Sequence, residues 1–285
     1  MIYKKIDLYE YFNKTKKTGQ KGILSIYLHE NDEDKNLNRL RPAILILPGG
    51  AYERCSKRES EPVALYYLAK SFNAFVLEYS CAPDAFYPTQ LLEASMAMAY
   101  IKKNAKEFNV LSDKVAVLGF SAGGHLAGTL STTYNDSLVK DYINEVASFC
   151  RPDATILCYP VVLSGEYSHA LSIQNVSGEN RELKDYLSID KRVNKNCPPA
   201  FIWATQNDNS VPCENAILMA LAYKRAGVPF ELHVFEDGKH GLSLCNEETA
   251  GDKSLEFVNS DVEKWLKLCD NFLRRHGFCL PKFYN

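Results

Sequence analysis

The sequence predicts an α/β fold with a mostly parallel central sheet and helices on both faces. Short apolar runs rich in β-branched residues alternate with longer amphipathic segments along the chain. Such runs are typical of strands buried on both faces of a parallel sheet, and the segments between them are typical of crossover helices. With 285 residues and 46% apolar composition, the chain can bury one large core, so we expect a single domain over residues 1–285.

The first half of the chain is expected to supply four strands and two helices. The expected strands cover residues 22–28, 41–47, 74–79 and 115–118, and the expected helices cover residues 61–70 and 89–106. Residues 22–28 alternate between apolar and polar side chains, which indicates an edge strand. Pro62 lies in the first turn of its helix, where proline is favoured. We expect loops at 31–41, which is charged, and at 81–88.

The second half continues the alternation but contains one irregular segment. Strands are expected at 154–159, 199–205 and 230–235, and helices at 122–130, 214–226 and around 261–275. Residues 161–196 are polar, mixed and poor in strand signal. A segment of this kind between two strands is typical of a small cap insertion rather than a second domain.

Composition excludes several classes of partner. The net charge is −2 without a long run of one sign, which argues against nucleic acid or an anionic membrane surface. The first residues lack an apolar signal segment, and no run of about 18 apolar residues occurs, so we expect a cytoplasmic protein. The nine cysteines form no C-x-x-C pair, so we expect neither a disulfide framework nor a metal site. The sequence does not determine the oligomeric state, and we consider a homodimer as the candidate assembly.

The strongest chemical signal is Gly-x-Ser-x-Gly at residues 119–123, centred on Ser121. A buried strand precedes it and a helix of small residues follows, which is the strand–turn–helix context of a nucleophile elbow. The glycines at 119 and 123 remove side chains that would clash where strand and helix meet. The helix N-terminus behind Ser121 favours developing negative charge. We therefore expect Ser121 to be a nucleophile.

A serine nucleophile needs a base that takes its proton and an acid that orients the base. With this kind of elbow, the acid and then the base follow the serine in chain order. His240 follows the last expected strand and is the predicted base. Asp208 lies in the loop after strand 199–205 and is the predicted acid, with Asp237 as the alternative.

Negative charge on a tetrahedral intermediate needs backbone N–H groups that point toward it. One should come from Ala122, the residue after the nucleophile. The others should come from the loop after strand 41–47, where Gly49, Gly50 and Ala51 let the backbone approach a substrate closely. We therefore predict an oxyanion hole made by Gly50, Ala51 and Ala122.

Taken together, these motifs resemble the bacterial acetylxylan-esterase-like branch of the α/β-hydrolases, which is related to the hormone-sensitive-lipase-type esterases. The resemblance runs from about residue 40 to 270. It rests on segments 48–52, 56–59, 61–64, 119–125, 208–212 and 240–241. It implies an α/β-hydrolase fold, the same three catalytic residues and the same oxyanion donors.

Two positions depart from the pattern of those relatives. Ala51 stands where the family often has a third glycine, which a backbone donor tolerates if its φ is negative. Pro48 stands where the hormone-sensitive-lipase-type motif has histidine.

The resemblance implies a serine carboxylesterase that releases short acyl groups, above all acetyl groups on sugars or xylo-oligosaccharides, without a metal or organic cofactor. Aromatic side chains in loops at the carboxyl ends of strands, Tyr52, Phe86 and Tyr87, should narrow the acyl side. The polar insert, with His169, should face the alcohol side.

Two other interpretations stay open at this point. One is an amidase, formamidase or peptidase on the same scaffold. The other is a non-catalytic ligand-binding protein, against which the intact order of serine, aspartate and histidine argues.

Overall fold

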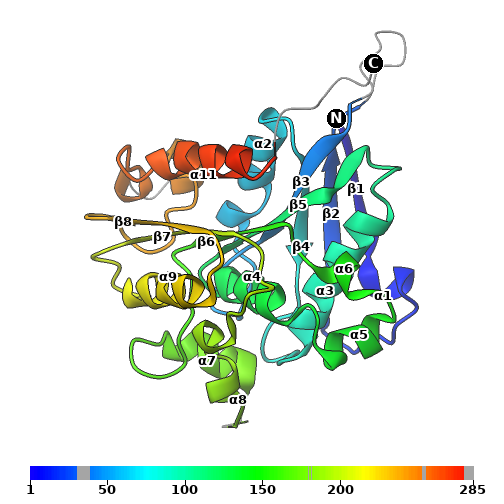
Figure 1. Ribbon diagram of the computed structural model, residues 1–285, viewed down its shortest axis with the longest axis horizontal. Helices are drawn as coiled ribbons and strands as arrows, with labels where there is room; N and C mark the ends of the chain where they lie inside the picture. Colours follow the sequence, from blue (N-terminus) through cyan, green and yellow to red (C-terminus); the bar gives the residue numbers. More distant parts are fainter. Residues whose placement is uncertain (31–38, 179, 181, 252–254, 279–285) are drawn as a thin grey trace.

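The computed structural model describes residues 1–30, 39–178, 180, 182–251 and 255–278 (Figure 1). Its centre is a single eight-stranded sheet with the strand order β1-β2-β4-β3-β5-β6-β7-β8. The strands are β1 (Ile2–Asp7), β2 (Ile23–Leu28), β3 (Arg41–Leu47), β4 (Asn73–Glu78), β5 (Val110–Phe120), β6 (Ala154–Cys158), β7 (Ala200–Thr205) and β8 (Phe230–Phe235). In this order, every neighbouring pair from β4 to β8 is parallel, whereas β2 pairs in the antiparallel direction with both β1 and β4.

Helices cover both faces of this sheet (Figure 1). On one face lie α2 (Glu61–Ala69) and α11 (Lys264–Arg275), and on the other lie α3 (Thr89–Lys103), α4 (Ala122–Thr133) and α9 (Glu214–Ala226). Strand β3 alternates between the two cores: Ala43, Leu45 and Leu47 pack with α3 and α4, while Ile44 and Ile46 pack with α2 and α11. This double burial explains why its sequence is a continuous apolar run.

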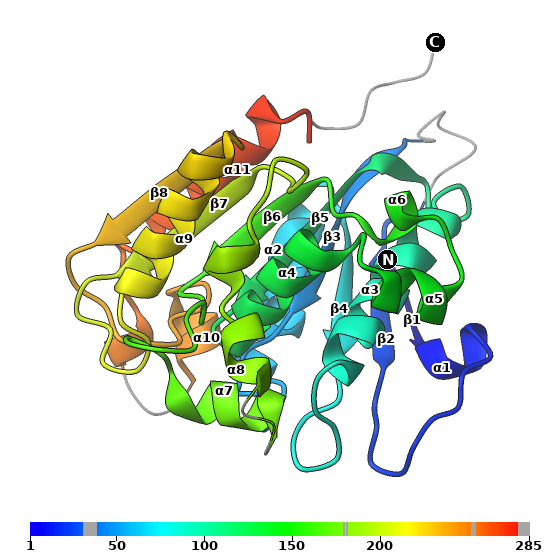
Figure 2. The same cartoon turned by 60° about the horizontal axis from the view of Figure 1, so that its bottom comes forward.

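Shorter elements complete the described part of the chain. They are α1 (Leu8–Tyr11), η2 (Lys57–Glu59), α5 (Ser137–Ile143), α6 (Ala147–Cys150), α10 (Glu247–Ala250) and η4 (Leu255–Phe257). The expected insert at 161–196 contains α7 (Ala170–Ser177), α8 (Glu182–Tyr186) and η3 (Ile189–Arg192) between β6 and β7. Figures 1 and 2 show α7 and α8 together at one end of the molecule, on the same side as α4.

One expected strand position is wrong, and several expected bounds differ from the structure, among them the ends of α3 at Lys103 and of α4 at Thr133. Residues 22–28 do not form an edge strand, because β1 pairs with β2 along its whole length and takes the edge position. The sequence did not indicate β1, since this strand carries two lysines and only one face of it meets the core. Strand β5 begins at Val110 rather than at 115, because the polar residues 112–114 continue the strand before it enters the core. Helix α11 begins at Lys264 rather than at 261. Residues 31–38 of the expected charged loop lie outside the described residues.

The parallel arrangement brings the carboxyl ends of β3, β4, β5, β6, β7 and β8 to one edge of the sheet. In open parallel sheets, ligands bind in the crevice at this edge. The loops that leave these six strands therefore form the candidate site.

Candidate active site

Ser121 occupies the sharp turn between β5 and α4. Its φ of 52° and ψ of −119° lie outside the conformations that non-glycine residues favour. Strand and helix come into contact at this turn because residues 119 and 123 are glycines. A Cβ on Gly119 would lie 2.1 Å from the Gly123 carbonyl oxygen, and a Cβ on Gly123 would lie 2.1 Å from the Leu47 carbonyl oxygen. The backbone N–H of Ser121 donates to the Cys158 carbonyl oxygen over 3.0 Å, which fixes the turn against β6.

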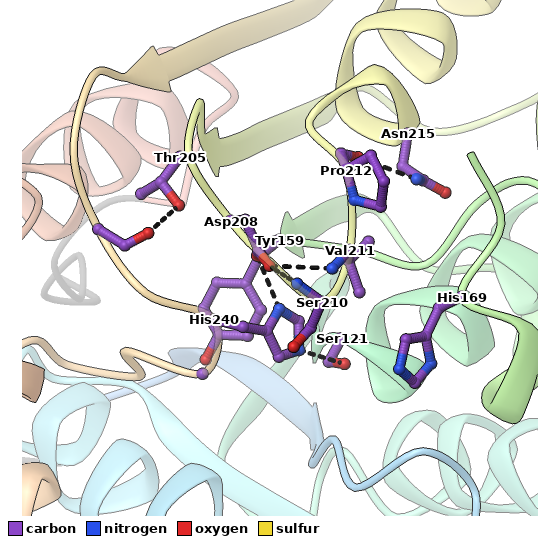
Figure 3. A network of polar contacts seen from close by, with 12 residues as sticks. Ser121, Tyr159, His169, Thr205, Asp208, Ser210, Val211, Pro212, Asn215 and His240 are labelled. Carbon is purple, nitrogen blue, oxygen red and sulfur yellow. Dashed lines mark hydrogen bonds and ion pairs between the residues drawn. The ribbon is translucent and has the colours of Figure 1, made fainter.

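Ser121, His240 and Asp208 form a continuous chain of hydrogen bonds (Figure 3). His240 Nε2 lies 2.8 Å from Ser121 Oγ, and His240 Nδ1 lies 2.7 Å from Asp208 Oδ2. Because a carboxylate only accepts, Nδ1 carries the proton and Nε2 is free to accept the serine proton. The other oxygen, Asp208 Oδ1, accepts from the backbone N–H groups of Ser210 and Val211 over 2.8 and 2.9 Å.

The side chains joined by these hydrogen bonds differ in burial, which suits proton transfer. The Asp208 side chain is 1% exposed, whereas that of His240 is 20% exposed. A buried carboxylate that two backbone N–H donors hold in place keeps its imidazole partner oriented.

Asp237, the alternative acid, lies elsewhere. Its carboxylate accepts from the Asn207 amide, and its backbone carbonyl accepts from Asn259 Nδ2 over 3.1 Å. Of the two aspartates, Asp208 is therefore the one that the structure brings to His240.

The loop after β3 has an unusual backbone at the positions predicted to form the oxyanion hole. Gly50, Ala51 and Tyr52 have φ values of 123°, 56° and 57°. The condition stated for an alanine at position 51, a negative φ, is not met, because the turn has a positive φ at three successive residues. Within the described part of the chain, the N–H groups of Gly50, Ala51 and Ala122 donate to no protein acceptor. These donors are available to a bound oxyanion.

With this geometry in place, comparisons with known proteins identify the family. The family model BD-FAE matches residues 24–222, a range that holds the nucleophile turn, the β3 loop and Asp208. The chain belongs to the BD-FAE family. Its α/β-hydrolase fold and its resemblance to acetylxylan-esterase-like proteins are thereby confirmed.

Three similar proteins show the range of this BD-FAE chain's relatives. Endo-1,4-beta-xylanase B of Butyrivibrio fibrisolvens is 39% identical over 82% of this chain and 37% of its own length. Acetylxylan esterase of Xylanibacter ruminicola is 29% identical over 79% of this chain and 45% of its own length. The chain thus spans less than half of either curated relative. A solved structure, the acetyl ester-xyloside bifunctional hydrolase from Caldicellulosiruptor lactoaceticus, is 38% identical with a TM-score of 0.77, over 90% of this chain and 88% of that one.

The predicted substrate-binding residues of this BD-FAE protein fall into two groups. Tyr52 is not on the rim: it is 1% exposed, and its hydroxyl donates to His125 Nδ1 over 2.8 Å. The loop turns it inward, because its left-handed backbone directs the side chain into the core. Phe86, which is 41% exposed, and the half-buried Tyr87 line a cavity of about 530 Å³ together with residues of α7. Loop 81–88 and the insert therefore share one cavity, and the assignment of acyl and alcohol sides stays a prediction.

His169 lies beside the hydrogen-bonded chain, at the N-cap of α7 (Figure 3). Its Nδ1 accepts from the Ser172 backbone N–H and lies 2.8 Å from Ser172 Oγ. Burial and the neighbouring His240 lower the pKa of His169. A neutral ring whose Nδ1 accepts carries its proton on Nε2, so His169 is a hydrogen-bond donor next to the site.

Sequence reasoning assigned no role to two buried side chains next to the site, Glu59 and Tyr159. Tyr159 follows β6, and its ring lies 5.0 Å from the His240 ring in an edge-to-face arrangement. No pattern in the sequence indicated this contact, because it joins positions 81 residues apart.

No helix in the described residues is both long and apolar enough to cross a bilayer.

Proposed function

We propose that this protein is a serine carboxylesterase that hydrolyses short-chain acyl esters, above all acetyl groups on sugars or xylo-oligosaccharides. The observation that carries the proposal is the hydrogen-bonded chain from Ser121 through His240 to Asp208. It lies at the N-terminus of α4, beside backbone N–H groups that have no protein acceptor in the described residues. Acyl transfer requires this arrangement, a serine next to its base and next to N–H donors for the oxyanion.

In the first half of the reaction, Ser121 Oγ attacks the ester carbonyl carbon as its proton passes to His240 Nε2. Asp208 stabilises the imidazolium through Nδ1. The carbonyl oxygen becomes an oxyanion and accepts hydrogen bonds from the N–H groups of Gly50, Ala51 and Ala122. When the intermediate collapses, the alcohol leaves with the proton from His240, and the acyl group stays on Ser121.

In the second half, His240 takes a proton from a water molecule that attacks the acyl-enzyme. Collapse of this second intermediate releases the carboxylic acid and returns the proton from His240 to Ser121 Oγ. The cycle needs no metal or organic cofactor, because the protein supplies both the nucleophile and the proton carrier.

The acetyl-sugar part of the proposal is supported by the names of relatives, an acetylxylan esterase and an acetyl ester-xyloside hydrolase. It is also supported by the chemistry of the cavity next to the oxyanion-hole loop. The exposed ring of Phe86 and the amide side chains of Gln174 and Asn175 line this cavity, and Asn175 donates to the Ala51 carbonyl oxygen. Aromatic faces and amide groups are suited to the apolar face and the hydroxyl groups of a sugar. His169 Nε2 is a further donor for the alcohol side.

We also keep residues 161–196 as a cap insertion of a single domain over residues 1–285. A cytoplasmic location is supported by the eight cysteines of the described residues, which are free thiols and suit a reducing compartment. The homodimer stays a prediction.

The test of the proposal is the Ser121→Ala variant. Hydrolysis of p-nitrophenyl acetate should fall by about 10⁴- to 10⁶-fold, because only the oxyanion hole and binding remain. Hydrolysis of acetylated xylo-oligosaccharides, followed by acetate release, should fall equally. The melting temperature should stay close to that of the wild type.

Covalent labelling gives an independent readout. A fluorophosphonate should modify the wild type at Ser121, identified by peptide mass spectrometry, and should not modify Ser121→Ala. Ser131→Ala is the matched control, because Ser131 is buried in the same helix and bonds only within the core. Labelling at another serine, or an active Ser121→Ala variant, would refute the proposal.

A further inference from the structure

The short helix η2 places a buried carboxylate behind the site. Glu59 is 3% exposed. Its Oε2 accepts from the backbone N–H of Gly49 over 2.8 Å, and its Oε1 accepts from the Tyr159 hydroxyl over 2.7 Å. One carboxylate therefore holds two segments that are about a hundred residues apart, since Gly49 precedes the oxyanion-hole residues and Tyr159 follows β6.

The Gly49 contact brings Glu59 close to the nucleophile. A Cβ on Gly49 would lie 2.7 Å from Glu59 Oε2 and 3.0 Å from Ser121 Cβ. Gly49 is thus packed between the carboxylate and the nucleophile turn. The next two residues carry the proposed donors Gly50 and Ala51, so the direction of their N–H groups depends on where Gly49 is held.

The Tyr159 contact extends the link to the histidine loop. Tyr159 OH accepts from the backbone N–H of Ser243 over 2.9 Å, and Ser243 is three residues after His240. The Tyr159 ring also packs against the His240 ring at 5.0 Å. Burial and the nearby Glu59 raise the pKa of Tyr159 well above its usual value, so its hydroxyl keeps the proton that it donates to Glu59.

Arg58, the neighbour of Glu59, makes a second link to the same loop. Its guanidinium donates to the Gly241 carbonyl oxygen, and its own carbonyl oxygen accepts from Ser243 Oγ over 2.8 Å. The segment 58–59 therefore contacts the loop of the base and the loop of the oxyanion hole at the same time.

We propose that Glu59 is a positioning residue that holds the oxyanion-hole loop and the His240 loop in one mutual geometry, through Gly49 on one side and Tyr159 on the other. This inference rests on the proposed esterase function. Catalysis by preorganised donors depends on their placement, and an error of about 1 Å lowers rates by about 100-fold. Glu59 does not touch the substrate, so its effect should appear in the transition state rather than in substrate binding.

The experiment compares Glu59→Gln and Tyr159→Phe with a matched control, Glu93→Gln. A glutamine keeps the volume of Glu59 but has one acceptor oxygen for two donors, and Tyr159→Phe keeps the ring against His240 but removes the hydroxyl. Glu93 is a carboxylate of the same kind: it is fully buried in α3 and accepts from the Ser80 N–H over 2.6 Å and from the Tyr9 hydroxyl over 2.7 Å. Neither of its partners is part of the site.

For Glu59→Gln, we expect kcat with p-nitrophenyl acetate to fall about 10- to 100-fold while KM changes less than threefold. Affinity for an aryl trifluoromethyl ketone, which forms a tetrahedral oxyanion adduct on serine, should fall by the same factor. Tyr159→Phe should lower both quantities about 10-fold. The double variant should be no worse than Glu59→Gln, because both changes break the same link. Glu93→Gln should lower the melting temperature but leave kcat and inhibitor affinity within twofold of the wild type.

The outcomes separate this inference from the proposed function. If the wild type is not labelled by a fluorophosphonate at Ser121, the esterase proposal itself fails. If it is labelled, but folded Glu59→Gln or Tyr159→Phe keeps kcat within twofold, the positioning role is overturned. The role is also overturned if either variant behaves like Glu93→Gln and loses only thermal stability. Should Glu59→Gln not fold, Tyr159→Phe decides, because it leaves the Glu59–Gly49 bond in place.

Discussion

The residues that would carry the chemistry lie in backbone conformations that their neighbours enforce. Ser121 and Ala51 have φ values of 52° and 56°, and Tyr159 has a φ of 36°. For non-glycine residues, such conformations cost about 1–2 kcal/mol each. The backbone N–H of Ser121 donates to the Cys158 carbonyl oxygen, and the backbone N–H of Tyr159 donates to the Trp203 carbonyl oxygen over 2.7 Å. The neighbouring strands therefore hold both turns in place. These strained residues lie in the turns that position the proposed nucleophile and oxyanion donors.

At the same scale, Asp208→Asn should separate the two candidate acids. The asparagine oxygen would keep the Ser210 and Val211 N–H groups, so its NH₂ would face His240 Nδ1 and force the proton onto Nε2. That tautomer cannot accept the Ser121 proton, and kcat should fall about 10³- to 10⁴-fold. Asp237→Asn, the control, should lose less than about tenfold. Steady-state kinetics on p-nitrophenyl acetate make the comparison, and the reverse order would assign the acid to Asp237.

The sequence predicted the contacts of Ser121, Asp208 and His240 because chain order and position after strands restrict them strongly. It could not predict Glu59 and Tyr159, since their contact depends on how the β3 and β6 loops meet in space. Tyr52 was misplaced for a similar reason. Its position in a loop at the sheet edge is readable from the sequence, but the direction of its side chain depends on a left-handed φ of 57°.

Among the elements, α4 connects the nucleophile turn to the insert. His125, on its first turn, accepts at Nδ1 from Tyr52 and donates from Nε2 to the Leu187 carbonyl oxygen over 2.8 Å. One imidazole thus joins the helix, the oxyanion-hole loop and the residue that follows α8. Both ring nitrogens are engaged in the neutral form. Protonation would place a charge on a buried ring and reverse the bond to Tyr52, whose O–H would lose His125 as its acceptor.

This arrangement makes a pH-dependent prediction for stability. Burial lowers the pKa of His125 from 6.5 to about 4. The unfolded chain therefore binds more protons between these two values, so the contribution of His125 is complete above pH 6.5 and is lost as the pH falls toward 4. Between pH 7 and pH 5, this residue should remove about 2 kcal/mol from the free energy of unfolding.

Urea denaturation of the wild type and of His125→Gln at the two pH values measures the effect. Glutamine does not titrate, so the free energy of unfolding of the variant should fall by about 2 kcal/mol less than that of the wild type. Equal changes in the two proteins would show that folding does not lower the pKa of His125.

The elements themselves were largely predictable, because strands buried on both faces and the helices between them have distinct patterns. The exceptions are informative. β1 and the first residues of β5 are polar on one or both sides, and such strands are specified by their pairing partners more than by their own side chains. The edge position of the sheet is a property of pairing, so an alternating pattern in residues 22–28 could not define it.

At the scale of the whole molecule, the loops that follow six parallel strands lie at one edge of the sheet, and the insert lies against them. Asn175 of α7 donates to the Ala51 carbonyl oxygen over 2.9 Å, and the Tyr87 N–H donates to the Val176 carbonyl oxygen over 2.8 Å. The insert is therefore bonded to the oxyanion-hole loop and to loop 81–88. The cavity at this junction is a composite of segments that are far apart in sequence.

The Phe86→Ala variant tests whether this cavity binds the sugar part of the substrate. Phe86 presents a half-exposed ring to a cavity of about 530 Å³, and Asn175 connects that cavity to the oxyanion-hole loop. Loss of a ring that stacks on a sugar should cost about 1 kcal/mol, which corresponds to a five- to tenfold lower kcat/KM. The loss should appear for acetylated xylo-oligosaccharides but not for p-nitrophenyl acetate, which should stay within twofold because it is too small to fill the cavity. Tyr11→Ala is the control, since Tyr11 is similarly exposed at 44% but lies on α1. Equal losses on both substrates would mean that Phe86 supports the loop, and no loss on either would place the sugar elsewhere.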